Sequence, residues 1–217
     1  NFFGSPSYRN FTLKFADGTT QALSTDLPLS QLPEVNLTLN GTADDDILTG
    51  GIGNDIINAG DGYNDITGGQ GNDTITGGYD RDTYYYNLGD GFDTIIDPNG
   101  KDQIIFGEGI SKDDLRFRRN GNDLWLIINN DLAQGMKLVN FFASDDNKIE
   151  TLKFADNSSV NLATAGLTLD QWDTDDNITG TSYDDVIYGN NGKDTLSGGS
   201  GKDILIGGQG NDMLYGG

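Results

Sequence analysis

Aspartates at a fixed spacing are the side chains in this sequence best suited to chemistry. Residues 68–76 read Gly-Gly-Gln-Gly-Asn-Asp-Thr-Ile-Thr, with the carboxylate of Asp73 at the sixth position and Ile75 at the eighth. This nine-residue unit recurs, intact or altered, over most of the chain. Carboxylates stacked at a regular interval repel one another unless a cation lies between them. Calcium suits such a site because it accepts about six to eight oxygen ligands with less geometric demand than magnesium.

Two blocks of repeat units carry the candidate ligands. Units start at residues 41, 50, 59, 68 and 77, resume at 88 and 97 after a two-residue insertion, and return at 171, 180, 189, 198 and 207. The sixth-position side chains, expected to bind metal, are Asp46, Asp55, Asn64, Asp73, Asp82, Asp93, Asp102, Asp176, Asp185, Asp194, Asp203 and Asp212. Further ligands, mainly backbone carbonyls, are expected at Gly51, Gly53, Gly60, Gly62, Gly68, Gly69, Gln70, Gly71, Gly77, Gly189, Asn190, Gly192, Gly198, Gly207 and Gln209.

Stacking follows if two units form one turn, because residues 18 apart then lie above one another. The eighth-position residues would form the core, and glycines at positions one, two and four would take positive φ. The expected pairs are Asp46/Asn64, Asn64/Asp82, Asp82/Asp102, Asp55/Asp73, Asp73/Asp93, Asp176/Asp194, Asp194/Asp212 and Asp185/Asp203. The best sites would be Asp55/Asp73, Asp194/Asp212 and Asp185/Asp203. Asn64 departs from the pattern, so its two sites should be weaker or rebuilt around Asp65.

Composition excludes several classes of function. The 217-residue chain has a net charge of −21, which disfavours direct binding to nucleic acid or an anionic membrane. Of the 34 acidic residues only three are glutamates, and aspartate with 32 glycines indicates turns rather than helices. Without cysteine or histidine, disulfides, thiolate sites and histidine-based catalytic triads are impossible here. No nucleophile constellation remains, so this stretch is predicted to be non-catalytic.

A longer period of 139 residues overlies the short one. Asn1-Phe2-Phe3 recurs as Asn140-Phe141-Phe142, and residues 12–17 recur as 151–156. This spacing predicts an excerpt of a modular array with flanking repeat modules, in which residues 1–23 end a preceding module.

The middle of the chain has a different pattern. Residues 111–114 predict one short helical turn, and 115–119, 124–128, 137–142, 149–155 and 160–162 predict strands. We therefore expect an all-β fold in which two stacks of parallel turns are joined by a small antiparallel unit. The expected boundaries are 1–40 (tail and connector), 41–105 (first stack), 106–170 (antiparallel segment and connector) and 171–217 (second stack). Tyr84, Tyr85 and Tyr86 could form a sugar-binding platform, although bulky packing where the repeat distorts is favoured.

The in-register nonapeptides resemble the calcium-binding repeats of RTX (repeats-in-toxin) proteins. The middle segment, with Phe106-Gly-Glu-Gly-Ile110 and Leu152-Lys-Phe-Ala-Asp156, resembles the haemolysin-type calcium-binding-related segment found between such repeats. The resemblance implies two parallel β-rolls with about six to eight Ca²⁺ ions. It also implies secretion from a Gram-negative bacterium through type I machinery, and calcium-driven folding within a larger toxin, exoenzyme or adhesin. The alternative is an array in a calcium-rigidified cell-surface adhesin or surface-layer protein.

Overall fold

The computed structural model describes residues 12–14, 20–22 and 35–217. The chain divides into two compact units, residues 1–34 and 35–217. Helix in the described residues is limited to two single 3₁₀ turns, η2 (Lys112–Asp114) and η3 (Asp145–Asn147). Neither turn has the length or the apolar character needed to cross a bilayer. The protein is therefore all-β, as predicted.

The first unit contains one described hairpin. Strands β1 (Thr12–Lys14) and β2 (Thr20–Ala22) pair antiparallel, with Leu13 opposite Gln21. The rest of the predicted tail and connector before residue 35 lies outside the described residues.

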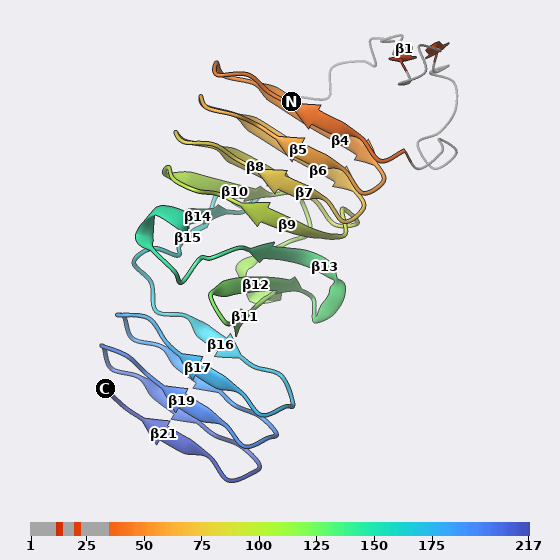
Figure 1. The fold of residues 1–217 in the computed structure, drawn as a ribbon. Coiled ribbons are helices and arrows are strands. Elements are labelled where there is room, and N and C mark those ends of the chain that lie inside the picture. Colours follow the sequence, from red (N-terminus) through yellow and green to blue (C-terminus); the bar gives the residue numbers. More distant parts are fainter. Residues whose placement is uncertain (1–11, 15–19, 23–34) are drawn as a thin grey trace. The chain divides into compact units, whose positions relative to one another are not determined.

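The first repeat block forms two parallel sheets from alternate strands (Figure 1). Strands β3 (Thr38–Asn40), β5 (Ile56–Asn58), β7 (Thr74–Thr76) and β9 (Phe92–Ile96) form part of one sheet. The other sheet contains β4 (Ile47–Ile52), β6 (Asp65–Gln70), β8 (Thr83–Tyr86) and β10 (Asp102–Phe106). Ile57 pairs with Ile75 one turn later, and Ile75 pairs with Ile95 across the insertion. Two nonapeptides therefore make one turn.

The eighth-position residues form the core of these turns. Ile57, Ile66 and Ile104 have no exposed surface, and each lies beside the equivalent residue of a neighbouring turn. A three-residue strand buries too little by itself, so stacking makes the apolar core continuous. Leu214, on an edge strand of its sheet, is the exception because it is exposed.

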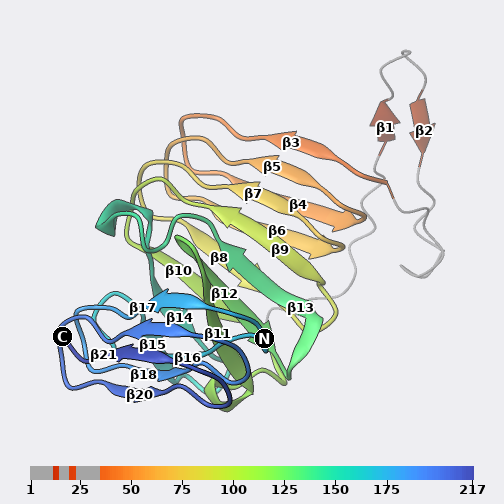
Figure 2. The same cartoon turned by 60° about the horizontal axis from the view of Figure 1, so that its bottom comes forward.

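The middle segment joins the two repeat blocks within one sheet. Strands β11 (Leu115–Asn120), β12 (Asp123–Ile128) and β13 (Asp131–Leu138) form an antiparallel meander. Its outer strands pair parallel to the repeats, β13 with β9 and β11 with β16 (Thr168–Asp170). The result is a ten-stranded sheet that runs from β3 to β20 through the meander (Figure 2). The predicted antiparallel strands are present, but they extend the sheet of the repeats.

The second sheet of the first block is extended in a similar way. Strand β14 (Ile149–Lys153) pairs parallel to β10, and β15 (Ser159–Asn161) pairs antiparallel to β14. The β14–β15 register places Leu152 opposite Val160, which is the β1–β2 register shifted by 139 residues. The long sequence period is therefore also a structural period.

The second repeat block has the same parallel pairing. Strands β17 (Asn177–Thr179), β19 (Thr195–Ser197) and β21 (Met213–Tyr215) form a three-stranded sheet. Strands β18 (Val186–Tyr188) and β20 (Ile204–Ile206) continue the ten-stranded sheet from β16.

Some local predictions differ from the structure. The predicted strand at 137–142 is wrong at its end, because β13 stops at Leu138 and Asn140 turns the chain with φ of 59°. Strands β3 and β16 lie in segments expected to be connectors, because short strands without the glycine pattern can still pair with a neighbouring turn. Tyr84 and Tyr86 are each 2% exposed, so these two side chains pack in the core and are not available as a sugar-binding platform.

Candidate metal centres

In each stacked pair, one side-chain oxygen of the later residue accepts a backbone N–H of the preceding turn. The Asp55 N–H donates to Asp73 Oδ1 at 2.7 Å, and the Asp73 N–H donates to Asp93 Oδ1 at 2.9 Å. The same bond joins Asp46 to Asn64, Asn64 to Asp82, Asp82 to Asp102, Asp176 to Asp194, Asp194 to Asp212 and Asp185 to Asp203. The structure thus places every predicted pair on adjacent turns, with the side chains in a ladder.

The second oxygen of many ladder carboxylates has no partner. Buried Oδ2 atoms without a hydrogen bond belong to Asp55, Asp73, Asp102, Asp176, Asp194 and Asp203. Burial of an ionised oxygen without compensation is costly. The one ion pair within the described residues joins Lys148 to Asp145, outside the ladder. These orphaned carboxylate oxygens fit a hard divalent cation such as calcium.

Glycine shapes the space around each sixth-position carboxylate, here called the cradle, in two ways, as the unit at 68–76 shows. Gly69 and Gly71 have φ of 101° and 134°, a conformation that favours glycine. Gly68 does not have positive φ, but a Cβ there would lie 2.2 Å from Asp73 Oδ2. The expectation of positive φ at position one is therefore wrong. Glycine is needed there for the close approach of the carboxylate.

Burial also opposes ionisation of the ladder in the metal-free chain. Loss of solvation raises the pKa of Asp73 to about 6 and that of Asp93 to about 8. Burial likewise raises the pKa of Asp55, Asp82 and Asp176. A bound cation favours the charged form and would counteract this effect.

Asn64 fills its own cradle with its amide group. Its Oδ1 accepts from the Asp46 N–H, while Nδ2 donates to the carbonyls of Gly60 and Gly62 at 3.4 and 3.1 Å. The amide nitrogen therefore occupies carbonyls that were expected to face a cation. Asp65 does not rebuild the site, since it lies on β6 beside inward-facing Ile66 and accepts from the Tyr85 hydroxyl.

Three other ladder carboxylates are satisfied within their own unit. Thr42 Oγ1 donates to Asp46 Oδ2 at 2.9 Å, and Thr181 Oγ1 donates to Asp185 Oδ2 at the same distance. The Gly78 N–H donates to Asp82 Oδ2. In the units of Asp46 and Asp185, the sequence signal for this bond is a threonine at position two. The prediction of the Asp185/Asp203 site did not take that threonine into account.

The predicted turn ligands lie immediately before the sixth position, and several already bind other groups. The carbonyls of Gln70 and Gln209 accept from Gly53 and Gly192 at 2.8 and 2.9 Å, which links successive turns. The Asn190 amide donates to Asp170 Oδ1 and to the Gln171 carbonyl. A carbonyl oxygen has two lone pairs, so a carbonyl bonded once can still accept a cation.

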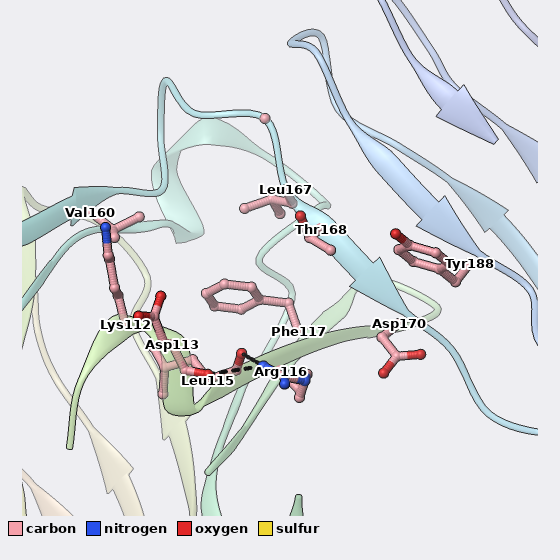
Figure 3. A pocket seen from close by; sticks show the side chains of 11 residues that line it. Lys112, Asp113, Leu115, Arg116, Phe117, Val160, Leu167, Thr168, Asp170 and Tyr188 are labelled. Atoms are coloured by element: carbon pink, nitrogen blue, oxygen red, sulfur yellow. Dashed lines mark hydrogen bonds between the residues drawn. The ribbon is translucent and has the colours of Figure 1, made fainter. Parts of the chain in front are cut away.

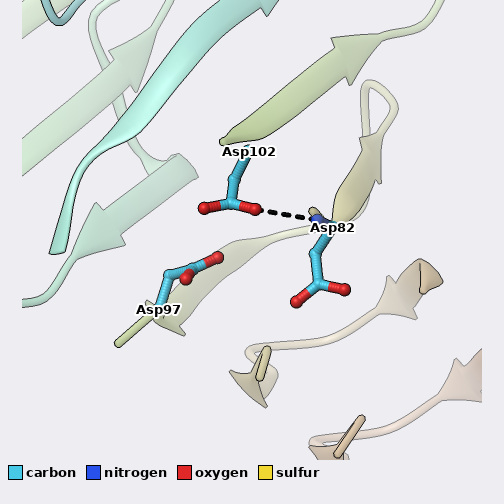
Figure 4. Close-up of side chains that lie close together, drawn as sticks. All are labelled: Asp82, Asp97 and Asp102. Carbon is cyan, nitrogen blue, oxygen red and sulfur yellow. Dashed lines mark hydrogen bonds between the residues drawn. The ribbon is translucent and has the colours of Figure 1, made fainter. Parts of the chain in front are cut away.

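Two acidic side chains beside the ladder were missed by the sequence analysis. Asp97 stands at the first position of its unit, where most units have glycine, and it lies close to Asp82 and Asp102 (Figure 4). Glu150, on β14, accepts the Asp102 N–H through Oε2 at 2.7 Å. An acid at position one was a usable signal for Asp97. Glu150 lies outside the repeats, so no spacing pointed to it.

A separate hollow of about 600 Å³ lies where the meander meets β16 and β18 (Figure 3). Phe117, Leu167 and Tyr188 line it together with charged residues. Its Arg116 guanidinium donates to the carbonyls of Asp113 and Leu115, which fixes the side chain locally.

Curated proteins and solved structures were each compared with the chain. No curated protein matches the chain. Among solved structures, the chain is similar to the extracellular lipase LipA from Serratia marcescens at 21% identity and a TM-score of 0.21. The match covers 82% of this chain but only 27% of the lipase chain. A TM-score this low carries no argument about this protein.

Family models match the two kinds of segment separately. The RTX calcium-binding nonapeptide repeat matches four times, over residues 38–66, 64–92, 173–205 and 188–217. The haemolysin-type calcium-binding protein related domain matches residues 123–164. Together these matches cover well over half of the chain, and they fall on the parallel turns and on the middle segment, respectively. The chain belongs to the RTX family of calcium-binding nonapeptide repeat proteins.

Proposed function

We propose that this chain is a non-catalytic, calcium-driven folding module of a larger secreted protein. The observation that carries the proposal is the row of buried Oδ2 atoms that have no hydrogen-bond partner. Family membership supports calcium as the ion. The folded turns bring together carboxylates that the unfolded chain keeps apart, so the free energy of binding contributes to folding.

The proposed ions lie between sixth-position side chains of successive turns. The pairs are Asp55/Asp73, Asp73/Asp93, Asp82/Asp102, Asp176/Asp194, Asp194/Asp212 and Asp185/Asp203. The two pairs that include Asn64 are proposed to be weak, because the amide nitrogen occupies the cradle. The total agrees with an expectation of about six to eight ions.

The proposed organisation keeps two calcium-binding rolls, 41–105 and 171–217, with 106–170 between them. In a low-calcium cytosol the chain would remain unfolded, ready for type I export, and it would fold outside the cell. The ladder has no cationic partner among the described residues, which supports dependence on an external ion.

A second candidate is one module of a calcium-rigidified adhesin array. The observation that favours it is the 139-residue period, since the β1–β2 hairpin and the β14–β15 hairpin share one register. Further copies of this module in the parent protein would support the array. An enzymatic or pore-forming domain beside a single pair of modules would support a toxin or exoenzyme.

Circular dichroism and size-exclusion chromatography of the 217-residue chain test the main proposal. We expect a compact, β-rich chain in millimolar Ca²⁺ and an expanded, disordered chain after chelation. Equal compactness in both states would overturn calcium-driven folding. A hydrolase assay with clear turnover would overturn the non-catalytic assignment.

A further inference from the structure

We propose that Arg119 closes an open sheet edge of the second repeat block and so makes the order of that block depend on the middle segment. Its guanidinium takes the place of the backbone N–H that a preceding turn would supply to β17. The cap is built from the chain's own residues and holds no ion, so the inference goes beyond calcium binding.

Strand β17 lies at the edge of its sheet. Within the described residues, it begins the three-stranded sheet and pairs with β19 alone. The ten-stranded sheet enters the second block through β11 and β16, whereas the six-stranded sheet has β15 as its own edge. The edge of a parallel sheet presents unpaired backbone groups, which another strand could bind unless something covers them.

The donor missing at this edge can be identified from the other turns. The carbonyl of Ser197, at position nine of its unit, accepts the N–H of Gly180 in the preceding turn at 2.8 Å. Thr179 has the same position one turn earlier, so its donor would be Leu162, 18 residues before Gly180. The Leu162 N–H instead donates to the Glu150 carbonyl at 2.7 Å. The Thr179 carbonyl is therefore left without the bond that the repeat would give it.

Arg119, on β11, supplies a donor to this carbonyl. Its Nη1 donates to the Thr179 carbonyl and to that of Gly180 at 3.4 Å, while Nε donates to the Gly121 carbonyl at 2.9 Å. Its Cζ lies 4.1 Å from the centroid of the Phe142 ring. A guanidinium suits this role because its N–H groups form a rigid fork and its face stacks on aromatic rings.

The two arginines at the end of β11 also bring positive charge to the start of the second block. Arg118 lies over the Trp172 ring, with Cζ 3.9 Å from the centroid. Burial raises the pKa of Asp176, and the charge of Arg118 opposes that rise. Burial lowers the pKa of Arg119, and the Asp185 carboxylate opposes that fall. Among the described residues neither arginine forms an ion pair, so both act on the ladder from a distance.

A hollow of about 430 Å³ lies beside the Arg119 guanidinium. Its lining includes Leu162, directly after the β14–β15 hairpin, and Thr179, at the end of β17. The backbone thus leaves a space between these two edges. The arginine side chain reaches across it to the Thr179 carbonyl.

The cap connects the two repeat blocks through the meander. Strand β11 pairs with β12, β12 with β13, and β13 with β9 of the first block. The backbone link from β11 to the second block is narrow, since its pairing with β16 contains one residue pair, Phe117 with Leu169. Arg119 adds a second link, to the other sheet of that block. Order in the meander should therefore be required for order at β17.

Hydrogen exchange of the full chain in saturating Ca²⁺ tests the cap. We compare the unsubstituted chain, Arg119→Met and the control Arg116→Met, after circular dichroism has confirmed that each is folded. Methionine keeps an unbranched apolar side chain but has no charge and no N–H donor. Arg116 is a matched control because it lies on the same strand and donates to the nearby carbonyls of Asp113 and Leu115.

We expect exchange at 177–181 to be about tenfold faster in Arg119→Met, because a hydrogen bond from a charged donor is lost. Exchange at 56–76 should be unchanged, and Arg116→Met should match the unsubstituted chain in both ranges. Equal exchange at 177–181 in all three chains would overturn the cap. So would equal acceleration of both ranges in Arg119→Met, or the same acceleration at 177–181 in Arg116→Met.

A crystal structure of the unsubstituted chain in Ca²⁺ covers the case in which Arg119→Met does not fold. It should show the Arg119 guanidinium on the Thr179 carbonyl. A calcium ion on that carbonyl, or a strand of a second copy paired with β17, would overturn the inference. Neither result would affect the proposed calcium sites at Asp55/Asp73 and Asp194/Asp212, which are distinct from this edge.

Discussion

At the scale of single residues, the two oxygens of a ladder aspartate have different roles. Oδ1 accepts a backbone N–H of the preceding turn, as Asp73 does from Asp55, and this bond needs only an acceptor. Oδ2 of Asp73 is buried without a partner, so it is the atom available to a cation. Asparagine preserves the first role and removes the second, because its Nδ2 is a donor. Asn64 shows this outcome within the native chain.

Asp73→Asn should therefore remove calcium without breaking the ladder. Asp73 is shared by the pairs with Asp55 and Asp93, so we expect two ions to be lost. Each lost ion would reduce calcium-dependent stability by about 2.7 kcal/mol when calcium is about 100 times its Kd. Dialysis gives the ion count, and urea unfolding in Ca²⁺ gives the stability. The exposed Asp61→Asn is the matched control, and an unchanged ion count for Asp73→Asn would refute the shared role.

A new site should be gained by changing both Ala59 and Asn64. At the equivalent position in another unit, a Cβ on Gly68 would lie 2.2 Å from Asp73 Oδ2, and Ala59 has such a Cβ. In the single variant Asn64→Asp, the new carboxylate would clash with the Ala59 methyl group. In the double variant, Ala59→Gly removes that methyl group and leaves room for the carboxylate of Asn64→Asp. We expect one additional ion, shared with Asp82, for the double variant and none for the single variant. If the single variant gains the ion, steric exclusion by Ala59 is wrong.

At the scale of elements, the ladder continues beyond the repeats. The Asp82 N–H donates to Asp102, and the Asp102 N–H donates to Glu150 on β14. Glu150 thus takes the place that a sixth-position aspartate would have on a further turn. Strand β14 pairs parallel to β10 as that turn would.

Glu150→Ala should loosen β14 and β15 before the repeats. It removes a partly buried hydrogen bond to a charged acceptor, a kind of bond that contributes about 1.5–3 kcal/mol. We expect faster hydrogen exchange at 149–161 in Ca²⁺, with exchange at 56–76 unchanged. Glu108→Ala, at an exposed glutamate, is the control. Equal acceleration throughout both ranges would show that Glu150 supports the whole fold rather than this one edge.

The elements also show what sequence can and cannot predict. The turn of two nonapeptides, the buried Ile57, Ile66 and Ile75 and the stacked aspartates follow from local spacing, because each unit repeats one geometry. The pairing of β13 with β9 and of β11 with β16 was not predicted. Alternating apolar residues indicate a strand but not its partner. Asp97 and Glu150 were missed for the same reason, since contacts across the stack join residues without a common period.

At the scale of the molecule, one of the two sheets of each repeat block joins the meander in a single ten-stranded sheet within 35–217. The chain has a net charge of −21, and the described ladder has no cationic side chain as a partner. Calcium and protons are therefore two alternative ways to neutralise the same buried oxygens. The choice between them should depend on pH.

The metal-free chain should be more stable in acid than at neutral pH. Burial raises the pKa of Asp73 to about 6 and that of Asp93 to about 8 from an ordinary 3.8, so the folded state holds protons that the unfolded state has released. This contribution is fully present below about pH 3.8 and is lost as the pH rises through about 6 to 8.

In calcium-free buffer we expect more compact, β-rich chain at about pH 5 than at about pH 8. In Ca²⁺ the order should reverse, because protons then compete with the ion. Circular dichroism and size-exclusion chromatography across this range measure both effects. A metal-free chain equally expanded at both pH values would show that neutralising the ladder is not enough to fold it, and that calcium acts by joining successive turns.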